Sequence, residues 1–273
     1  PVGALGGWRQ AARATAAWAV RWLSGWLLPV VALSAWALSA QHGWLPEQIL
    51  PPPQDVARML AEWWHSGELL DHLRISLQRV LGGFALGTGL GLSLGLLMGL
   101  SPLAKDYLAP SFKAFAQVPV LGWLPFLMLL VGIDEALKWL LIAKAAMVPV
   151  TLNTLAGVEN VPPRYLEVAR VLRLGTWQTL SRVVLPAAFA PIWTGVRHGL
   201  THAWLALVVV ELLASSEGLG YLIVYGRQLF QLDIVLAAVV VVGAVGWALD
   251  RAMATAEGRL LRWRRPLTAG EAR

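Results

Sequence analysis

The chain has 273 residues, of which 57% are hydrophobic and 14% are charged, with a net charge of +6 and no cysteine. This composition excludes an ordinary soluble domain and indicates an integral membrane protein. The lack of cysteine excludes a disulfide framework, a thiol nucleophile and a cysteine-based zinc site. The apolar runs are long and do not alternate, so the prediction is an all-α membrane domain rather than a barrel.

A first membrane span is predicted over residues 22–40. It follows an arginine- and tryptophan-bearing segment, 1–22, that is typical of the cytoplasmic membrane interface. The next segment, 41–73, is acidic and poor in arginine, which favours the outer side. Its two later histidines, His65 and His72, lie near acidic residues and allow a metal site as one interpretation. No fixed ligand spacing supports it, so we expect ordinary polar residues and no metal.

The second span, 76–100, is rich in glycine, and five glycines recur at every fourth residue from Gly83 to Gly99. Such a small-xxx-small ridge lets another helix approach closely. A phosphate-binding loop is excluded, because no strand precedes the glycines and no lysine stands at the required position. We therefore expect this span to pack tightly inside a helix bundle.

The third span is predicted over 114–131, after a short loop at 101–113, and it is broken by Pro119 and Pro125. The fourth span is predicted over 137–154. Lys144 falls inside the fourth span. An ionisable residue at membrane depth is a functional candidate. The same lysine can instead reach the membrane edge with its long side chain or pair with a neighbour. The sequence leaves both interpretations open.

The fifth span, 187–213, is unusually polar. Its polar and charged residues are Arg197, His198, Thr201, His202 and, near its far end, Glu211. Such residues do not face lipid, so we expect them to line a water-filled path or to pair across the bundle. Together with Lys144 they are the candidates for a translocation pathway. A sixth span is predicted over 234–249, followed by a basic cytoplasmic tail, 251–273.

The loop at 159–186 carries the longest charged interruption in the second half of the chain. One face of its predicted helix is an apolar stripe formed by Tyr165, Val168, Ala169 and Leu172. Charged residues recur on the other side, where Glu167 can pair with Arg164 or Arg170. Two prolines suit the helix start, Gly175 suits its end, and Thr176 suits the cap of a second short helix. Periodicity alone allows either a helix on the bilayer surface or a docking helix for a partner protein.

The spacing of this loop resembles the cytoplasmic coupling loop, or EAA loop, of bacterial ABC-importer permeases. That pattern is Glu-Ala-Ala, three residues, Gly, nine residues, and Ile-x-Leu-Pro. Here Glu167-Val168-Ala169 is followed at the matching distances by Val183 and Leu185-Pro186. The pattern's glycine falls on Arg173, so the chain departs from it at a turn. The resemblance implies an ATPase-coupling set made of Tyr165, Glu167, Val168, Ala169, Arg170, Leu172, Arg173, Gly175, Leu185 and Pro186.

A topology with six spans and both termini in the cytoplasm places this loop where a cytosolic ATPase would meet it. Lysine and arginine gather in the segments that this topology puts inside, whereas the outer segments hold only Arg58 and Arg227. The positive-inside rule explains this distribution. It also removes the reason to interpret the net positive charge as a nucleic-acid signal.

Features over about residues 25–255 are similar to the permease subunits of aliphatic sulfonate, taurine and nitrate importers, the alkanesulfonate permease above all. They include the proline elbow at 50–53, the Ser76-Leu77-Gln78-Arg79-Val80 stretch and Gly218-Leu219-Gly220. The resemblance implies a type I ABC-importer permease domain over 23–250, in the bacterial inner membrane. It also implies a homodimer with two cytosolic ATPase subunits and a periplasmic substrate-binding protein. No Gly-x-x-x-x-Gly-Lys-Ser/Thr loop is present, so ATP and Mg are expected on the partner ATPase and no cofactor or enzymatic activity on this chain.

The favoured hypothesis is therefore import of a small organic anion, an aliphatic sulfonate first, with nitrate, taurine or another small oxyanion as the alternative. An ion-coupled secondary transporter is a second alternative, but no internal repeat relates the two halves of the chain. A membrane scaffold without transport is a third. The polar residues of the fifth span argue against it, because they are costly in a membrane unless they are used.

Overall fold

The computed structural model describes residues 25, 27–44, 46 and 49–262. These residues form helices joined by short turns, with no strand among them. The interfacial segment predicted over 1–22 lies outside the described residues, as does the tail from 263 onwards.

Four helices are long and apolar enough to cross a membrane. They are α3 (Glu68–Leu100), α6 (Glu135–Glu159), the run Thr176–Ala214 that contains α9 (Leu185–Ala214), and α11 (Leu232–Leu260). They correspond to the second, fourth, fifth and sixth predicted spans, and each is longer than predicted. A shorter apolar helix, Leu27–Gln41, covers most of the first predicted span. α11 also includes residues 251–260, which the sequence assigned to the tail.

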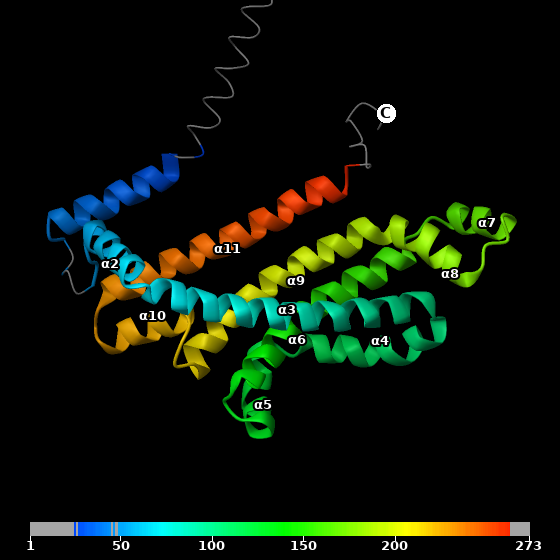
Figure 1. Cartoon of the computed structure of the whole chain (residues 1–273), viewed down its shortest axis with the longest axis horizontal. Coiled ribbons are helices and arrows are strands. Elements are labelled where there is room, and N and C mark those ends of the chain that lie inside the picture. Colours follow the sequence, from blue (N-terminus) through cyan, green and yellow to red (C-terminus); the bar gives the residue numbers. More distant parts are fainter. Residues whose placement is uncertain (1–24, 26, 45, 47–48, 263–273) are drawn as a thin grey trace, which may run out of the picture.

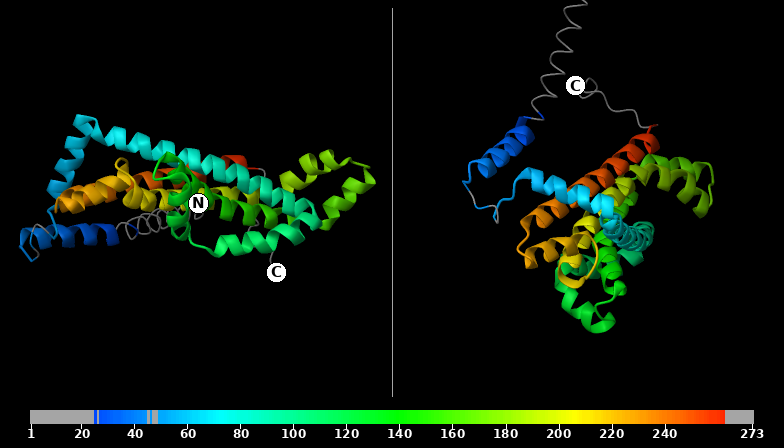
Figure 2. Two further views of the ribbon diagram at one scale, coloured as in Figure 1. Left: turned by 90° about the horizontal axis from the view of Figure 1, so that it is seen from below. Right: turned by 60° about the vertical axis from the view of Figure 1, so that its left-hand side comes forward.

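The long helices run side by side, and short helices stand at the two ends of the bundle (Figures 1 and 2). α2 (Pro53–Ser66) and α10 (Leu219–Gln228) lie at one end. α7 (Pro163–Val171) and α8 (Thr176–Thr179) lie at the other. We call these the α2–α10 end and the α7–α8 end.

The third predicted span is not a straight helix. The segment expected as a loop is instead α4 (Pro102–Gln117), and the chain then bends by 94° into η1 (Val120–Trp123) and α5 (Leu124–Val131). α5 projects away from the other helices (Figure 1). The break falls at Val118-Pro119, since a residue before proline is disfavoured in the helical region and Val118 is extended at φ −74°, ψ 118°. The described helices thus give four spans, or five if the bent pair is counted as one.

The glycine ridge packs α3 against α6, as predicted. A methyl group added at Gly87 would lie 2.2 Å from the carbonyl oxygen of Ala143, and one at Gly95 would lie 2.6 Å from Thr154 Cβ. Gly89, on the same helix, has nothing within 4 Å. The ridge therefore brings the two backbones closer than any larger residue permits.

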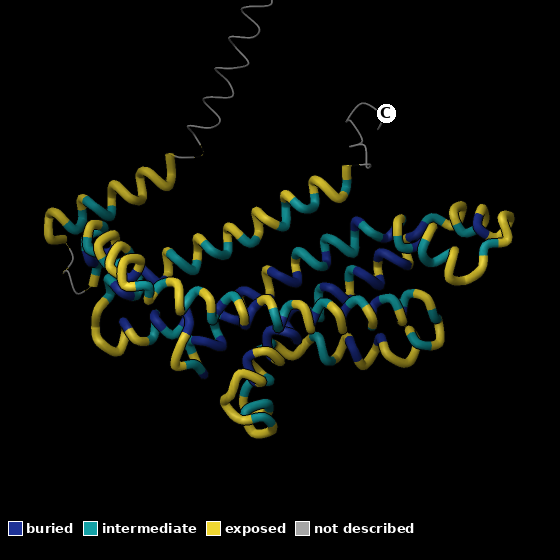
Figure 3. The backbone as a smooth tube through the Cα atoms, viewed as in Figure 1, coloured by how far each residue is buried: buried dark blue, intermediate teal, exposed yellow. Residues whose placement is uncertain are grey.

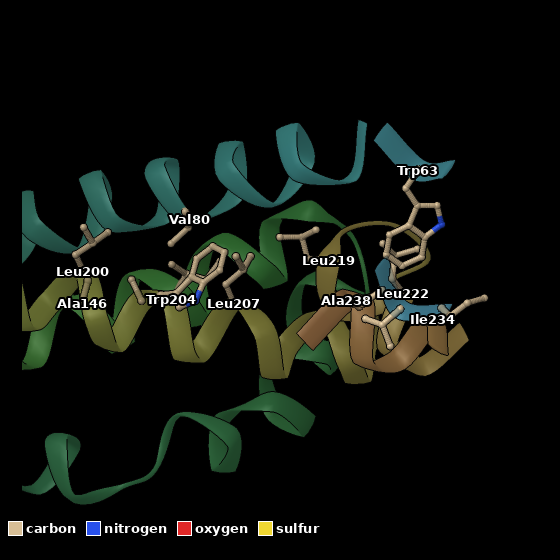
Figure 4. Close-up of a cluster of buried hydrophobic side chains, with 14 residues drawn as sticks. Trp63, Val80, Ala146, Leu200, Trp204, Leu207, Leu219, Leu222, Ile234 and Ala238 are labelled. Carbon is tan, nitrogen blue, oxygen red and sulfur yellow. The ribbon is translucent and has the colours of Figure 1, made fainter. Parts of the chain in front are cut away.

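The main apolar core joins α3, α6 and α9 with the α2–α10 end. Trp204 of α9 lies beside Val80, with Ala146 on one side of it and Leu207 on the other, and Leu219, Leu222 and Ile234 extend the cluster toward Trp63 (Figure 4). Buried positions concentrate on α6 and α9, whereas α11 has few buried residues and alternates between exposed and half-buried positions (Figure 3). Exposed apolar helix faces of this kind are normal where lipid or another membrane chain replaces water.

Candidate functional site

The α7–α8 turn is built by a regular helix C-terminus. The amide of Leu174 donates to the carbonyl oxygen of Ala169, and that of Arg173 donates to Arg170, both across 3.0 Å. These two bonds form a Schellman motif. In this motif the residue just after the helix end has left-handed backbone dihedral angles. Arg173 fills that place with φ 51°. The conformation that favours glycine is therefore present where the coupling-loop pattern has glycine, although this chain has arginine there.

Most of the predicted apolar stripe faces outward. Tyr165, Val168 and Leu172 are exposed, and so are two residues that the helical stripe did not include, Val171 at 81% and Trp177 at 73%. We call these five residues the docking face. Ala169, in contrast, is only 2% exposed. Ala169 therefore packs on the buried side of α7 and is not part of its exposed surface.

Glu167 is exposed at the edge of the docking face. It forms no ion pair with any described residue, so the pairing with Arg164 or Arg170 that the sequence allowed is not formed. Arg164 lies over the Tyr165 ring instead, 5.2 Å from its centre. The carboxylate is thus free to meet a cation on another protein.

The Leu185-Pro186 pair stands where the helix changes its winding. Between α8 and α9 the residues Leu180–Val184, labelled η2, form a π-helical turn, and α9 begins at Leu185 with Pro186 in its first turn. Proline has no N–H to donate, so it is tolerated at the start of a helix. The motif therefore fixes how the docking face joins a long helix of the bundle.

A buried charge network lies toward the α2–α10 end. Arg79 Nη1 donates to Glu211 Oε1 across 2.9 Å, and its other nitrogens donate to the Glu135 carboxylate, which Lys138 also contacts at 2.6 Å. Arg79 is 4% exposed and Glu211 is 0% exposed. The pair joins α3 to α9, and Glu135 adds α6.

The backbone closes around the Glu211 carboxylate. Gly220 N–H donates to its Oε2 across 2.9 Å, and Ser76 Oγ lies 2.9 Å from both carboxylate oxygens while accepting from Leu219 N–H. Gly218 has φ +107°, and a methyl group there would lie 2.3 Å from Glu211 Oε1. The carboxylate is enclosed by its own chain. The sequence listed Glu211 for the translocation pathway, but the structure gives it pairing across the bundle.

Arg197 also pairs across the bundle. Its guanidinium donates two hydrogen bonds to Asp250 of α11, at 2.9 and 3.0 Å, and one to Glu257 at 3.2 Å. These bonds fasten α11, which is otherwise poorly buried, to α9. Of the two interpretations made for the polar fifth span, Arg197 and Glu211 fit pairing.

The other polar residues of α9 and the buried lysine have different surroundings. His198, Thr201 and His202 are exposed. Lys144 is 9% exposed and donates to the backbone oxygen of Val118, at the elbow between α4 and η1. Lys144 and His202 line one cavity of about 460 Å³. The structure therefore brings Lys144 and His202 together at this cavity, whereas Arg197 and Thr201 line a different cavity of about 200 Å³.

His72, considered for a metal site, has a structural partner. Its Nδ1 accepts a hydrogen bond from Gly218 N–H across 3.0 Å. Within the part of the chain that the structure describes, no three His, Asp or Glu side chains are grouped closely enough to hold a metal ion.

Sequence reasoning missed Val171 and Trp177 on the docking face, and Ser76, Arg79, Glu135 and Lys138 in the charge network. Trp177 lies on α8, so the helical period of the α7 stripe does not reach it. The network residues come from distant parts of the chain. A signal was present in Arg79, since a charge inside a predicted span indicates a partner.

Comparison with known proteins agrees with this architecture. Residues 87–262 match the family model described as binding-protein-dependent transport system inner membrane component. The chain is 42% identical to the aliphatic sulfonates transport permease protein SsuC of Bacillus subtilis, over 79% of this chain and 78% of that protein. It is 33% identical to the taurine transport system permease protein TauC of Escherichia coli, over 78% and 80%. A chain of the inward-facing MetNI methionine ABC transporter shares the fold, with a TM-score of 0.53 and 16% identity over 66% of this chain and 92% of that chain.

Proposed function

The chain belongs to the family of binding-protein-dependent transport system inner membrane components, and from this premise we propose that it is the permease of an ATP-driven importer for aliphatic sulfonates. The relatives SsuC and TauC are named for aliphatic sulfonates and for taurine. Both cargoes carry a sulfonate group on a short carbon chain. We take that shared group as the cargo's recognised feature.

The docking face carries the proposal. An apolar surface with an unpaired carboxylate at its edge, at the end of a membrane bundle, is suited to a groove on a soluble partner. We assign that partner as a cytosolic ATPase subunit that holds the ATP and Mg, with Tyr165, Val168 and Leu172 as contacts. Glu167, Arg170 and Arg173 fix the register, while Ala169, Gly175, Leu185 and Pro186 shape and connect the face.

A second copy of this chain completes the transporter in this proposal. The exposed polar residues of α9, His198, Thr201 and His202, are costly against lipid. Facing a second permease across a water-filled path removes that cost. A periplasmic binding protein would deliver the cargo at the α2–α10 end. ATP-driven closure of the ATPase pair would then shift the bundle between two packings.

The experiment is co-purification of the tagged chain with its ATPase subunit, followed by ATPase assay in lipid nanodiscs. Glu167→Lys should abolish the rise in ATPase activity caused by binding protein loaded with ethanesulfonate. Asp106→Lys is the matched control, because Asp106 is an exposed helical carboxylate on α4, outside both the docking face and the α2–α10 end. Unchanged coupling in Glu167→Lys would remove the docking assignment. Stimulation by nitrate and not by ethanesulfonate would overturn the sulfonate assignment.

A further inference from the structure

Lys144 differs from the other buried or partly buried cations of the long helices. Arg79, Lys138 and Arg197 each contact a carboxylate within 3.2 Å. Lys144 forms no ion pair with any described residue. Its partners are the Val118 carbonyl oxygen and the face of the Phe115 ring, whose centre is 5.3 Å from Nζ.

A carbonyl and an aromatic ring stabilise a cation but do not neutralise it. A buried charge without a counter-ion is strongly unfavourable, and more so inside a membrane. The ammonium group has three N–H donors, of which the Val118 oxygen takes one. Two donors and a full positive charge therefore remain for another group.

The space beside Lys144 is of the right size and chemistry to hold that group. The cavity of about 460 Å³ falls in the range of small-molecule sites. Its polar lining is Lys144, Asn153 and His202, and none of the described lining residues is acidic. Val120, Val148 and Leu152 make apolar walls. A single ammonium group among apolar side chains can bind a small anion that carries an alkyl chain.

His202 adds a polar group from α9 to the two that α6 supplies. Its Nδ1 lies 2.9 Å from the His198 carbonyl oxygen, so Nδ1 carries the proton that makes this bond. Nε2 has no described hydrogen bond and is the ring nitrogen left for a ligand or water. The cavity is thus lined by residues of the bend at Val118–Val120, of α6 and of α9.

We propose that this cavity is a cargo subsite in which the sulfonate group is the counter-ion of Lys144 and the alkyl chain lies against Val120, Val148 and Leu152. The inference rests on the proposed function and adds where the cargo binds. A sulfonate stays ionised and offers three acceptor oxygens, which suits an ammonium with two free donors.

The test measures binding to the complex of permease and ATPase subunits in zwitterionic nanodiscs, without binding protein. Ethanesulfonate is the ligand, and ethyl methyl sulfone is its neutral analogue. The wild type should bind ethanesulfonate and not the sulfone. Lys144→Met should weaken binding about tenfold or more, since it removes a hydrogen bond to a charged group. Lys144→Arg should keep most of the affinity, because it keeps the charge.

Lys113→Met is the matched control, because Lys113 is an exposed lysine on α4 and its loss changes the net charge equally. Wild-type affinity in Lys144→Met, equal binding of the sulfone, or no binding to the wild type would each overturn the subsite. Loss of ethanesulfonate binding when the nanodiscs contain phosphatidylglycerol would assign the cavity to a lipid phosphate and also overturn it.

Uptake into proteoliposomes with the binding protein separates this inference from the proposed function. A wild-type complex that imports no ethanesulfonate would contradict the proposed function itself. If the wild type imports it and Lys144→Met imports it equally fast, only the subsite fails. Retained ATPase subunit in the variant shows that it has folded.

Discussion

Leu174 donates its backbone N–H to the carbonyl oxygen of Ala169, and this bond holds Arg173 between them at φ 51°. The turn keeps its shape although arginine is a poor residue for it. A left-handed conformation costs a residue with a side chain about 1–2 kcal/mol. The hydrogen bonds and the buried Ala169 therefore hold the turn against an unfavourable local preference.

Replacing Arg173 by glycine should stabilise the turn by about 0.5–1 kcal/mol, because the steric cost disappears and glycine's greater freedom in the unfolded chain offsets only part of the gain. Hydrogen exchange at the Leu174 amide should become slower. Arg170→Gly is the control, since Arg170 is helical and exposed, and there the exchange should become faster. If the exchange rate of the Leu174 amide changed in the same direction in both variants, the left-handed strain at Arg173 would be contradicted.

Removing Arg79 should destabilise the bundle strongly. Arg79→Met leaves the Glu211 carboxylate buried with its main charge partner gone, which costs about 3–5 kcal/mol. The double variant Arg79→Met, Glu211→Gln should regain much of that stability, because no uncompensated charge remains and the amide oxygen can still accept from Gly220 N–H. Thermal unfolding in detergent is the measurement. Arg58→Met, which removes an exposed arginine paired with Asp55, should change little.

The glycine ridge gives a prediction with its own control on one helix. Gly87→Ala should destabilise the protein by about 1–3 kcal/mol, because its methyl group meets the backbone of Ala143 and must push α3 from α6. Gly89→Ala faces open space and should be neutral or slightly stabilising. The measurement is the thermal unfolding temperature of both variants relative to the wild type. Equal effects would show that the ridge is not a close helix contact.

Arg197 should control how firmly α11 is attached. Arg197→Leu leaves Asp250 and Glu257 without the arginine that joins them to α9. We expect faster hydrogen exchange along α11 and little change along α6. The exchanged pair Arg197→Asp, Asp250→Arg should restore part of the protection. Unchanged exchange in Arg197→Leu would mean that apolar packing alone holds α11.

The sequence predicted local features well. Apolar runs located α3, α6, α9 and α11, and the four-residue period of the glycines located the face of α3 that meets α6. Periodicity and capping residues located α7 and α8, but α7 ends at Val171 and not near Gly175, and the residue that caps α8 is Gly175 and not Thr176. These features depend on neighbouring residues, so a local pattern carries them.

Features that depend on distant residues were not predicted. For Glu211 the sequence left both the pathway and pairing across the bundle open and named no partner, because Arg79 lies 132 residues away and no period joins them. The break at Pro119 was expected from the proline, but its angle of 94° was not, since a proline indicates a kink and not how large it is. Ala169 was placed on the outer stripe, because helical spacing does not say which side of α7 the bundle covers.

α9 sets a limit on how the bundle can move. Its 30 residues make a rod about 45 Å long, so a tilt of about 5° around the middle displaces each end by about 2 Å. Such a step is large beside the 2.9 Å bond between Arg79 and Glu211. Either α3 travels with α9 as one body, or that buried pair must break and re-form in every cycle.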